Sequence, residues 1–171
     1  MQGLVQVYTG NGKGKTTAAL GLALRAVGAG LKVFIAQFVK GMEYGELKAI
    51  RERFPEINIQ QYGRDCFIIN KPTEDDVKLA HKGLIEVDKI IQTGNYDIVI
   101  LDEANIAVYY QLFSIDDLLK IIHNKPQHVE IIITGRKAHP RLIEVADLVT
   151  DMQEIKHYYQ TGIKARKGIE L

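Results

Sequence analysis

A glycine-rich loop lies between an apolar segment and a helical pattern near the start of the chain. Residues 4–8 read LVQVY, residues 9–17 read TGNGKGKTT, and residues 15–30 show the spacing of a helix that ends in glycines. A strand, a glycine-rich loop and a Lys-Thr pair opening a helix form the arrangement that binds nucleotide phosphates. The alternative, a glycine-rich turn that only connects a strand to a helix, does not explain why all three features coincide.

The residue types in this loop suit a phosphate chain. Gly10, Gly12 and Gly14 let the backbone curl so that several N–H groups point inward, and the N-terminus of the following helix adds partial positive charge. Lys15 is expected to reach the outer phosphates, and the hydroxyl of Thr16 to hold Mg²⁺.

The loop departs from the strict phosphate-loop pattern at two positions. Thr9 stands where the pattern has glycine, and Gly10 supplies the flexibility one position later. Lys13 is an additional lysine, and it is either a solvated loop residue or extra positive charge for a triphosphate. Asn11 and Thr17 complete the expected nucleotide-binding segment.

Apolar segments alternate with helical patterns along the rest of the chain. The expected strands are 32–38, 57–62, 96–104, 129–135 and 147–155. Helices are expected at 45–54 and beginning at Thr73, Ser114 and Pro140. Continuous apolar strands between helices predict an α/β fold, a three-layer sandwich with a mainly parallel sheet. Ligands of such sheets bind beyond the carboxyl ends of the strands.

Composition and charge narrow the range of functions. The length of 171 residues suits one domain, 1–171, whose last residues, 156–171, we expect to form a tail near the active site. With 22 basic and 21 acidic residues the net charge is +1, which does not favour a nucleic-acid partner. Cys66 is the only cysteine, and neither a signal peptide nor a long apolar segment is present. These features predict a cytoplasmic protein with no internal disulfide and no membrane partner.

An acidic pair follows the most apolar expected strand. The segment 98–101, IVIL, brings Asp102 and Glu103 to the carboxyl end of that strand, beside the phosphate loop. One of the two carboxylates would fix Mg²⁺, directly or through water, and the residue types do not decide which. The alternative is a strand-end acid that caps the next turn.

Other polar residues follow strands whose ends should face the nucleotide. Gln37 and Lys40 come at the end of the second strand, and Arg136 follows the segment 131–134, IIIT. Arg136 can pair with phosphate oxygens in a fork geometry that lysine lacks, although each of these residues is alternatively a surface polar group. Among the histidines only His157, in the tail, is singled out.

Several of these segments, in this order, resemble the P-loop type of cob(I)alamin (corrinoid) ATP adenosyltransferase. The matching pieces are TGNGKGKTTAALGLALRAVG, QFVKG followed by YGE, VILDEAN, ITGRKAHPRLIEVADLVT and EIKHYYQTGIKARKGIEL. A phosphate loop alone is shared by many unrelated enzymes, whereas its combination with the last two pieces is far more specific. The resemblance covers most of the chain.

The resemblance implies transfer of the 5′-deoxyadenosyl group from ATP to the cobalt of a reduced corrinoid, with triphosphate as the leaving group. It also implies a RecA-like fold, dependence on Mg²⁺, a homodimer and an electron-donating reductase as partner. By position, residues 10–17 hold the triphosphate, Thr16 and Glu103 serve the metal, and Arg25 and Arg136 lie near the nucleotide.

Cob(I)alamin is itself a strong nucleophile, so such an enzyme needs no general base. It must align cobalt with C5′ and stabilise the charge that develops on the departing triphosphate. Lys15, Arg136 and Glu103 are therefore the expected catalytic residues, with Lys13 as added positive charge.

Two features differ from better-known members of the family. Those members carry a covering helix ahead of the first strand, whereas here the strand begins within the first few residues, so we expect the cover to come from the C-terminal tail. Those members also place aromatic residues under the corrin. Here the segment 62–70 offers Tyr62 and Phe67, which with His157 are the expected corrinoid contacts. The alternative for this segment is a surface loop with Phe67 in the core.

Other function classes share the phosphate loop and the acidic pair. A P-loop phosphohydrolase or small-molecule kinase would form ADP, and a carrier would bind a corrinoid without forming a product. A DNA motor fits less well, because the charge is balanced and the chain is short.

Overall fold

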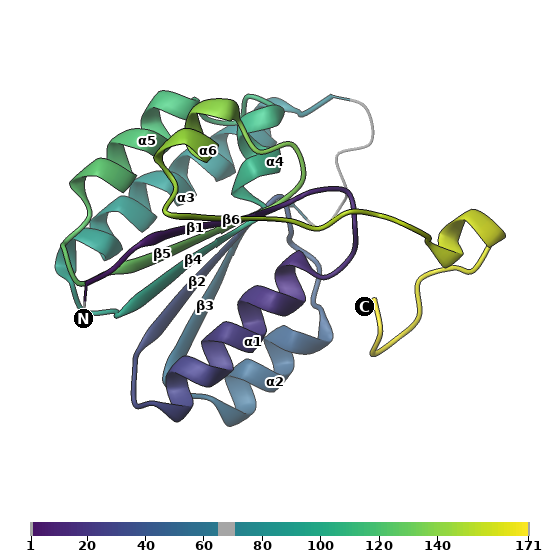
Figure 1. Ribbon diagram of the computed structural model, residues 1–171, viewed down its shortest axis with the longest axis horizontal. Helices are drawn as coiled ribbons and strands as arrows, with labels where there is room; N and C mark the ends of the chain where they lie inside the picture. The colour runs from purple at the N-terminus through teal and green to yellow at the C-terminus, as the bar shows by residue number, and fades with distance from the viewer. Residues whose placement is uncertain (1, 65–70, 171) are drawn as a thin grey trace.

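A six-stranded sheet lies at the centre of the computed structural model, which describes residues 2–64 and 71–170 (Figure 1). Its strands are β1 (Val5–Thr9), β2 (Val33–Phe38), β3 (Ile57–Tyr62), β4 (Ile98–Asp102), β5 (Glu130–Thr134) and β6 (Leu148–Asp151). Their order across the sheet is β3-β2-β4-β5-β1-β6, and every neighbouring pair is parallel. The predicted α/β fold with a parallel sheet is confirmed.

Helices cover both faces of this sheet. Figure 1 shows α1 (Lys15–Gly28) and α2 (Gly45–Arg53) on one face. The opposite face carries α3 (Glu74–Thr93), α4 (Ala104–Tyr109), α5 (Ile115–Asn124) and α6 (Pro140–Val145). The three-layer arrangement and the strand order match a RecA-like P-loop fold. Among the described residues, none of the helices has both the length and the apolar character needed to cross a membrane.

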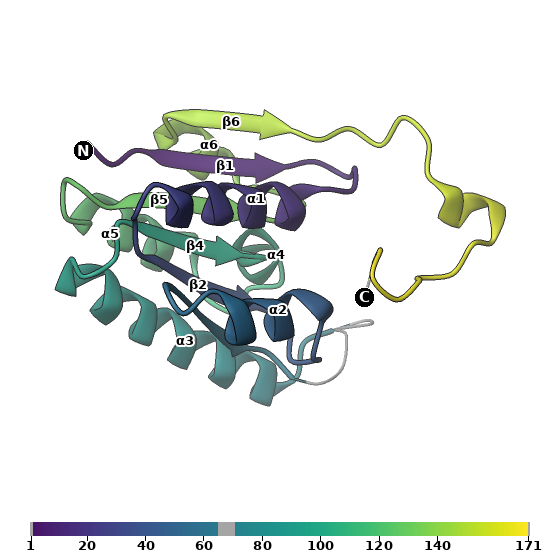
Figure 2. The ribbon, with the colours of Figure 1, turned by 90° about the horizontal axis from the view of Figure 1, so that it is seen from below.

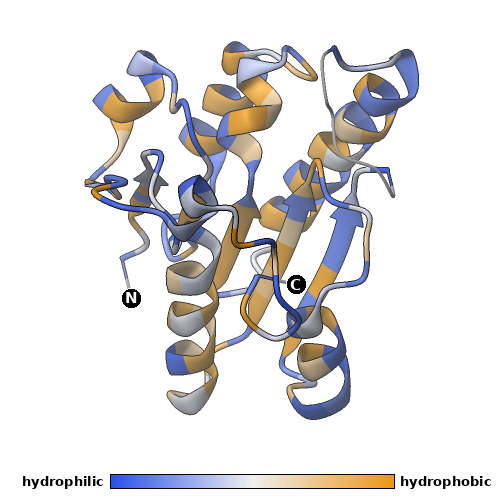
Figure 3. Cartoon of the chain, turned by 90° about the vertical axis from the view of Figure 1, so that its right-hand side faces the viewer, coloured by the Kyte–Doolittle hydropathy of each residue, from blue (hydrophilic) through white to orange (hydrophobic). Residues whose placement is uncertain are grey.

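Successive side chains of the central strands point to opposite faces of the sheet, so the hydrophobic core is divided into two parts. In β2, Val33 and Ile35 pack with α1 and α2, whereas Phe34 and Phe38 pack on the face of the larger helical layer. Both sets are fully buried, which is why β2 is apolar without interruption instead of alternating with polar residues. Figure 3 shows the same concentration of hydrophobic residues along the central strands.

Two helices begin at the expected capping boxes. The Thr73 hydroxyl accepts a hydrogen bond from the backbone N–H of Asp76, and the Asp76 carboxylate accepts one from the N–H of Thr73. Ser114 and Asp117 repeat this exchange at the start of α5. Pro140 occupies the first position of α6.

Two predicted strands are too long, and neither α4 nor a short 3₁₀ helix near the C-terminus was predicted. The strand expected at 96–104 ends at Asp102, because Glu103 adopts a left-handed conformation (φ 60°) and α4 begins at the next residue. The strand expected at 147–155 ends at Asp151. Beyond it the chain leaves the sheet, forms the short 3₁₀ helix η1 (Tyr158–Thr161) and turns back toward the carboxyl edge of the sheet (Figures 1 and 2).

Candidate active site

The phosphate loop connects β1 to α1, and its glycines meet two local requirements. Gly10 and Gly14 have positive φ angles of 93° and 119°, which residues with a side chain rarely adopt. The loop also packs closely on the chain that follows β6: the N–H of Gly12 donates to the carbonyl of Met152 at 2.6 Å. A Cβ atom at Gly10 would lie 2.2 Å from the carboxylate of Asp151.

Lys15 lies inside the curve of this loop. Its side chain is buried, and its ammonium group donates to the carbonyls of Gly10 at 2.8 Å and Gly12 at 2.6 Å. Burial lowers the pKa of Lys15, and the carboxylate of Glu103 opposes that shift. The ammonium group is therefore held at the centre of the loop by the loop's own backbone.

Asp102, at the end of β4, is the buried centre of the site, with 1% of its surface exposed. Its Oδ1 accepts hydrogen bonds from the hydroxyls of Thr16 at 2.8 Å and Thr134 at 2.7 Å. Its Oδ2 accepts from the ammonium of Lys40 at 2.8 Å and the amide of Gln37 at 3.2 Å. Four donors, from α1, β5 and β2 with its following turn, thus satisfy one carboxylate, as a buried charge requires.

Glu103 differs from its neighbour because fewer groups satisfy it. Burial raises the pKa of the Glu103 carboxyl, and repulsion from Asp102 raises it further, while nearby cations led by Lys40 partly offset both effects. Its backbone N–H donates to the hydroxyl of Thr134, which in turn donates to Asp102. Thr134 therefore orients both members of the acidic pair.

Lys40 follows β2 and joins the acidic pair to the phosphate loop. Its ammonium lies 3.3 Å from the hydroxyl of Thr16 as well as 2.8 Å from Asp102. Burial alone would lower the pKa of Lys40, but the carboxylates of Asp102 and Glu103 outweigh this effect, and the pKa is raised. Lys40 is thus a positive charge at neutral pH, buried among oxygen atoms.

The C-terminal tail reaches the other side of the loop. The ammonium of Lys13 lies 3.0 Å from the carboxylate of Glu170 and 3.2 Å from the hydroxyl of Tyr158. Glu170 also pairs with Arg166, and hydrogen bonds from Arg166 and Tyr158 hold its pKa well below the usual range of glutamate. The cations of this group are exposed, with 41% of the Lys13 side chain and 50% of the Arg166 side chain accessible, so solvent screens each contact and it contributes little to stability.

These elements enclose a cavity of about 800 Å³. Its lining includes the predicted site residues Gly12, Lys13, Gly14, Lys15, Thr16, Thr17, Lys40, Glu103, Arg136 and His157. The volume lies within the range of pockets that hold nucleotides and other small ligands. The cavity lies between the phosphate loop, the acidic pair and the tail.

Other predicted residues lie beside or beneath this cavity. Thr9, Gly10 and Asn11 belong to the part of the loop next to β1. Gln37 and Asp102 are buried under the cavity and act on it through their hydrogen bonds.

Arg25 and Phe67 stand apart from this group. Arg25 is exposed in the last turn of α1, ten residues beyond Lys15 and therefore about 15 Å further along the helix. This position does not bring it to the lining of the cavity, and the predicted contact with the nucleotide stays a prediction. Phe67 lies outside the described residues.

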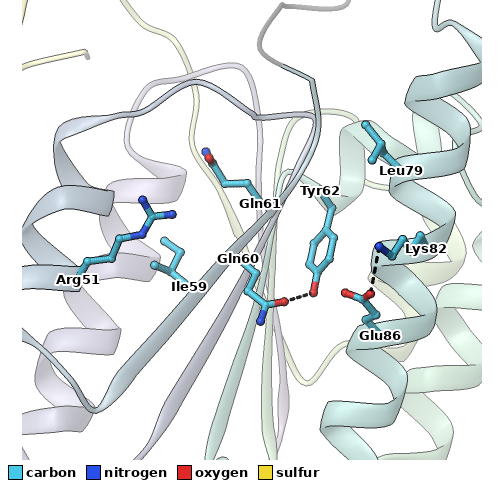
Figure 4. A pocket seen from close by; sticks show the side chains of 8 residues that line it. All are labelled: Arg51, Ile59, Gln60, Gln61, Tyr62, Leu79, Lys82 and Glu86. Atoms are coloured by element: carbon cyan, nitrogen blue, oxygen red, sulfur yellow. Dashed lines mark hydrogen bonds and ion pairs between the residues drawn. The ribbon is translucent and has the colours of Figure 1, made fainter.

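Tyr62 lies in a different place from the phosphate loop. Its ring packs on Phe38 with 5.7 Å between centroids, and its hydroxyl donates to the amide oxygen of Gln60 at 2.6 Å. Burial, followed by the nearby Glu86, raises the pKa of Tyr62. Figure 4 shows it in a second cavity, of about 440 Å³, beside the edge strand β3. Tyr62 is a core residue here, because β3 directs it toward α3, where Gly83 leaves room for the ring.

Sequence reasoning missed several residues of the site. Thr134 is buried at the end of β5 between the two acids, and the sequence shows it only as the last residue of an apolar strand. Tyr44 and Glu46 line the cavity from the start of α2. Asn105 is fully buried and donates to the carbonyl of Gly135, bracing the turn that carries Arg136.

The comparisons with known proteins agree with this arrangement. Residues 1–171 match the sequence model of a family described as ATP:corrinoid adenosyltransferase BtuR/CobO/CobP. The chain belongs to this family. It is 35% identical over 170 residues to a corrinoid adenosyltransferase of Pseudomonas aeruginosa, which covers 99% of this chain and 84% of that relative.

Two further members of the adenosyltransferase family give the same result. A corrinoid adenosyltransferase of Escherichia coli is 34% identical over 170 residues, covering 99% of this chain and 86% of the relative. The corrinoid adenosyltransferase CobA of Salmonella typhimurium is 34% identical over 173 residues, with the same coverage. The predicted family is confirmed, and these matches do not support the hydrolase or kinase alternatives.

Proposed function

We propose that this protein transfers the 5′-deoxyadenosyl group of ATP to the cobalt of a reduced corrinoid, cob(I)alamin or a precursor. The cobalt(I) electron pair forms the new bond to C5′, and the bond from C5′ to the triphosphate oxygen breaks with its electron pair. Triphosphate leaves intact. The observation that carries the proposal is the combination of a phosphate loop and an acidic pair at one cavity of a chain that belongs to this family.

The residues of the loop are suited to a leaving group that gains negative charge. Lys15 is held by the loop carbonyls, Lys13 contacts the tail, and Arg136 lines the cavity from the end of β5. Preorganised cations and N–H groups of this kind stabilise developing charge without having to move during the reaction. The loop would thus hold triphosphate and hydrolyse nothing.

The donor set beside the loop fits Mg²⁺. The Thr16 hydroxyl and the carboxylate of Asp102 are oxygen ligands of the type that Mg²⁺ prefers, and Glu103 lies next to them. The ammonium of Lys40 contacts two of these groups, Thr16 and Asp102, so their oxygen atoms already stabilise a positive charge at this position. Thr16 and the acidic pair would hold the ion, which would neutralise phosphate oxygens.

The corrinoid would approach from the side of the tail. His157 lines the cavity there, and its ring lies 4.6 Å from the ring of Tyr158. We place the lower face of the corrin near this segment, with Phe67 as the second contact. A homodimer and a separate reductase that supplies cobalt(I) complete the proposal, and sedimentation velocity tests the dimer directly.

The proposal is tested by an anaerobic assay in which MgATP, chemically reduced cobalamin and the protein are mixed in the dark. We expect loss of the cobalt(I) absorption band and formation of a light-sensitive alkylcorrinoid. An unchanged corrin spectrum with ADP and phosphate as products would overturn the proposal in favour of a hydrolase. Tight ATP-dependent binding of the corrinoid without any product would indicate a carrier.

A further inference from the structure

Lys40 lies where a bound metal ion would find its ligands. Its ammonium is 2.8 Å from Oδ2 of Asp102 and 3.3 Å from the hydroxyl oxygen of Thr16. These are two of the oxygen atoms that would hold Mg²⁺ in the proposed function. The Lys40 side chain is 16% exposed and that of Asp102 is 2% exposed, so the ion pair is largely shielded from water.

The residue before Lys40 adopts an unusual backbone conformation, which sets the direction of the Lys40 side chain. Val39 has a φ angle of 62°, which is rare for any residue with a side chain and rarer for a β-branched one. Such conformations persist where the surrounding structure imposes them, and they gather at functional sites. The chain therefore turns sharply at the end of β2, and the turn directs Lys40 toward Asp102.

An ammonium group and a divalent cation beside the same ligand oxygens repel each other and compete for those oxygens. While Lys40 pairs with Asp102, a metal ion that arrives alone must displace it and leave a shielded ammonium without its partner, which is unfavourable. A metal ion that arrives with a triphosphate does not meet this obstacle to the same degree, since the phosphate oxygens offer Lys40 a new anionic partner. The cavity beside Lys40 is open to such a ligand.

We propose that Lys40 is an internal cation that occupies the metal position until a polyphosphate enters, so that metal and nucleotide bind together. This inference deepens the proposed function and rests on its nucleotide site. The ring of Tyr44, which also lines the cavity, lies 5.8 Å from the ammonium and provides a second favourable environment when Lys40 leaves Asp102. In this scheme Lys40 has two roles: it competes with the metal ion in the empty site and contacts the phosphate chain once the nucleotide is bound.

The scheme predicts effects of opposite sign on two ligands. In Lys40→Met the competitor is removed, so Mn²⁺ alone should bind the nucleotide-free protein at least tenfold more tightly than in the wild type. Metal-free ATP should bind about tenfold more weakly, because the lysine is no longer available to the phosphate chain. Lys40→Arg keeps the charge and should stay within about threefold of the wild type for Mn²⁺.

The experiment measures Mn²⁺ binding to the full chain by electron paramagnetic resonance without nucleotide, and ATP binding by calorimetry in the presence of a chelator. Circular dichroism melting verifies that each variant is folded. In a Lys40→Met/Thr16→Val double variant, which lacks a metal ligand, the gain in Mn²⁺ affinity should disappear. That result would place the gained ion at this site.

Mn²⁺ affinity that is unchanged or weaker in folded Lys40→Met would overturn the inference. A purely structural role for Lys40 predicts that both ligands bind more weakly. Because neither measurement involves a corrinoid, failure of adenosyl transfer in the wild type would contradict the proposed function and leave this test standing.

Discussion

At the scale of single residues, the site is organised by how each charge is satisfied. Asp102 accepts four hydrogen bonds, whereas its neighbour Glu103 is buried beside a like charge and has a raised pKa. Lys15 is held by loop carbonyls, and Lys13 pairs with the tail. Within each pair, the two acids or the two lysines, the side chains have the same chemistry in the sequence, and only their surroundings distinguish them.

The difference between the two loop lysines can be measured. Lys15→Met should lower kcat/KM for ATP by at least 10²-fold, because a preorganised donor to the leaving group is lost. Lys13→Met should lower it by about tenfold or less, since that ammonium is exposed and screened by solvent. Steady-state kinetics of both variants checks this order, and an equal loss in both would contradict it.

Glu103 should limit stability at neutral pH. Its raised pKa means that the folded state disfavours the ionised form, so stability falls as pH rises from the ordinary value of 4.5 through the raised one. Glu103→Gln should therefore increase the free energy of unfolding by about 1 kcal/mol at pH 8, with the gain vanishing at about pH 4. Urea unfolding at both pH values tests this, and a gain that does not depend on pH would show that ionisation is not the cause.

At the scale of elements, the sequence predicts the start of a helix correctly where neighbouring residues alone determine it. The capping boxes at Thr73 and Ser114 and the proline at position 140 each mark a helix start from neighbouring residues alone. The end of β4 was missed, because the conformation of Glu103 depends on Thr134, which is 31 residues away and accepts its backbone N–H. A pattern of neighbouring residues cannot predict a contact between residues so far apart in the sequence.

The cap of α5 gives a prediction at this scale. Ser114→Ala should lower the free energy of unfolding by about 1 kcal/mol, because the hydroxyl no longer accepts from the N–H of Asp117. The hydrogen bond from Ser114 lowers the pKa of Asp117, so that its contribution is present above the ordinary value of 3.8 and is lost as pH falls. Urea unfolding at pH 7 and at about pH 2, below the ordinary value, should show the difference between the two proteins shrinking at the lower pH.

At the scale of the whole molecule, the parallel sheet brings distant segments to one edge. The sequence predicted the layers, the phosphate loop and the acidic pair, because apolar strands between helices imply where strand ends meet. It did not predict that Lys40 bridges Thr16 and Asp102, or that Tyr62 is buried in the core. Those outcomes depend on which side chains meet across the sheet, and spacing along one chain does not encode them.

The tail provides a separable test at this scale. Residues 156–170 contribute no fully buried side chain, so a chain truncated after Ile155 should keep its fold, with a melting temperature within about 5 °C of the full chain. Adenosyl transfer should fall sharply, because part of the cavity lining is lost. Retained activity with full stability would show that the tail does not cover the site.

The most direct measurement separates the phosphorus products of the anaerobic reaction and compares them with the corrinoid formed. In the proposed reaction the loop holds a leaving group, so we predict intact triphosphate in equimolar amount with adenosylcorrinoid, and no ADP. ADP and phosphate formed in proportion to the ATP consumed, with no alkylcorrinoid, would contradict the assignment of the phosphate loop to adenosyl transfer.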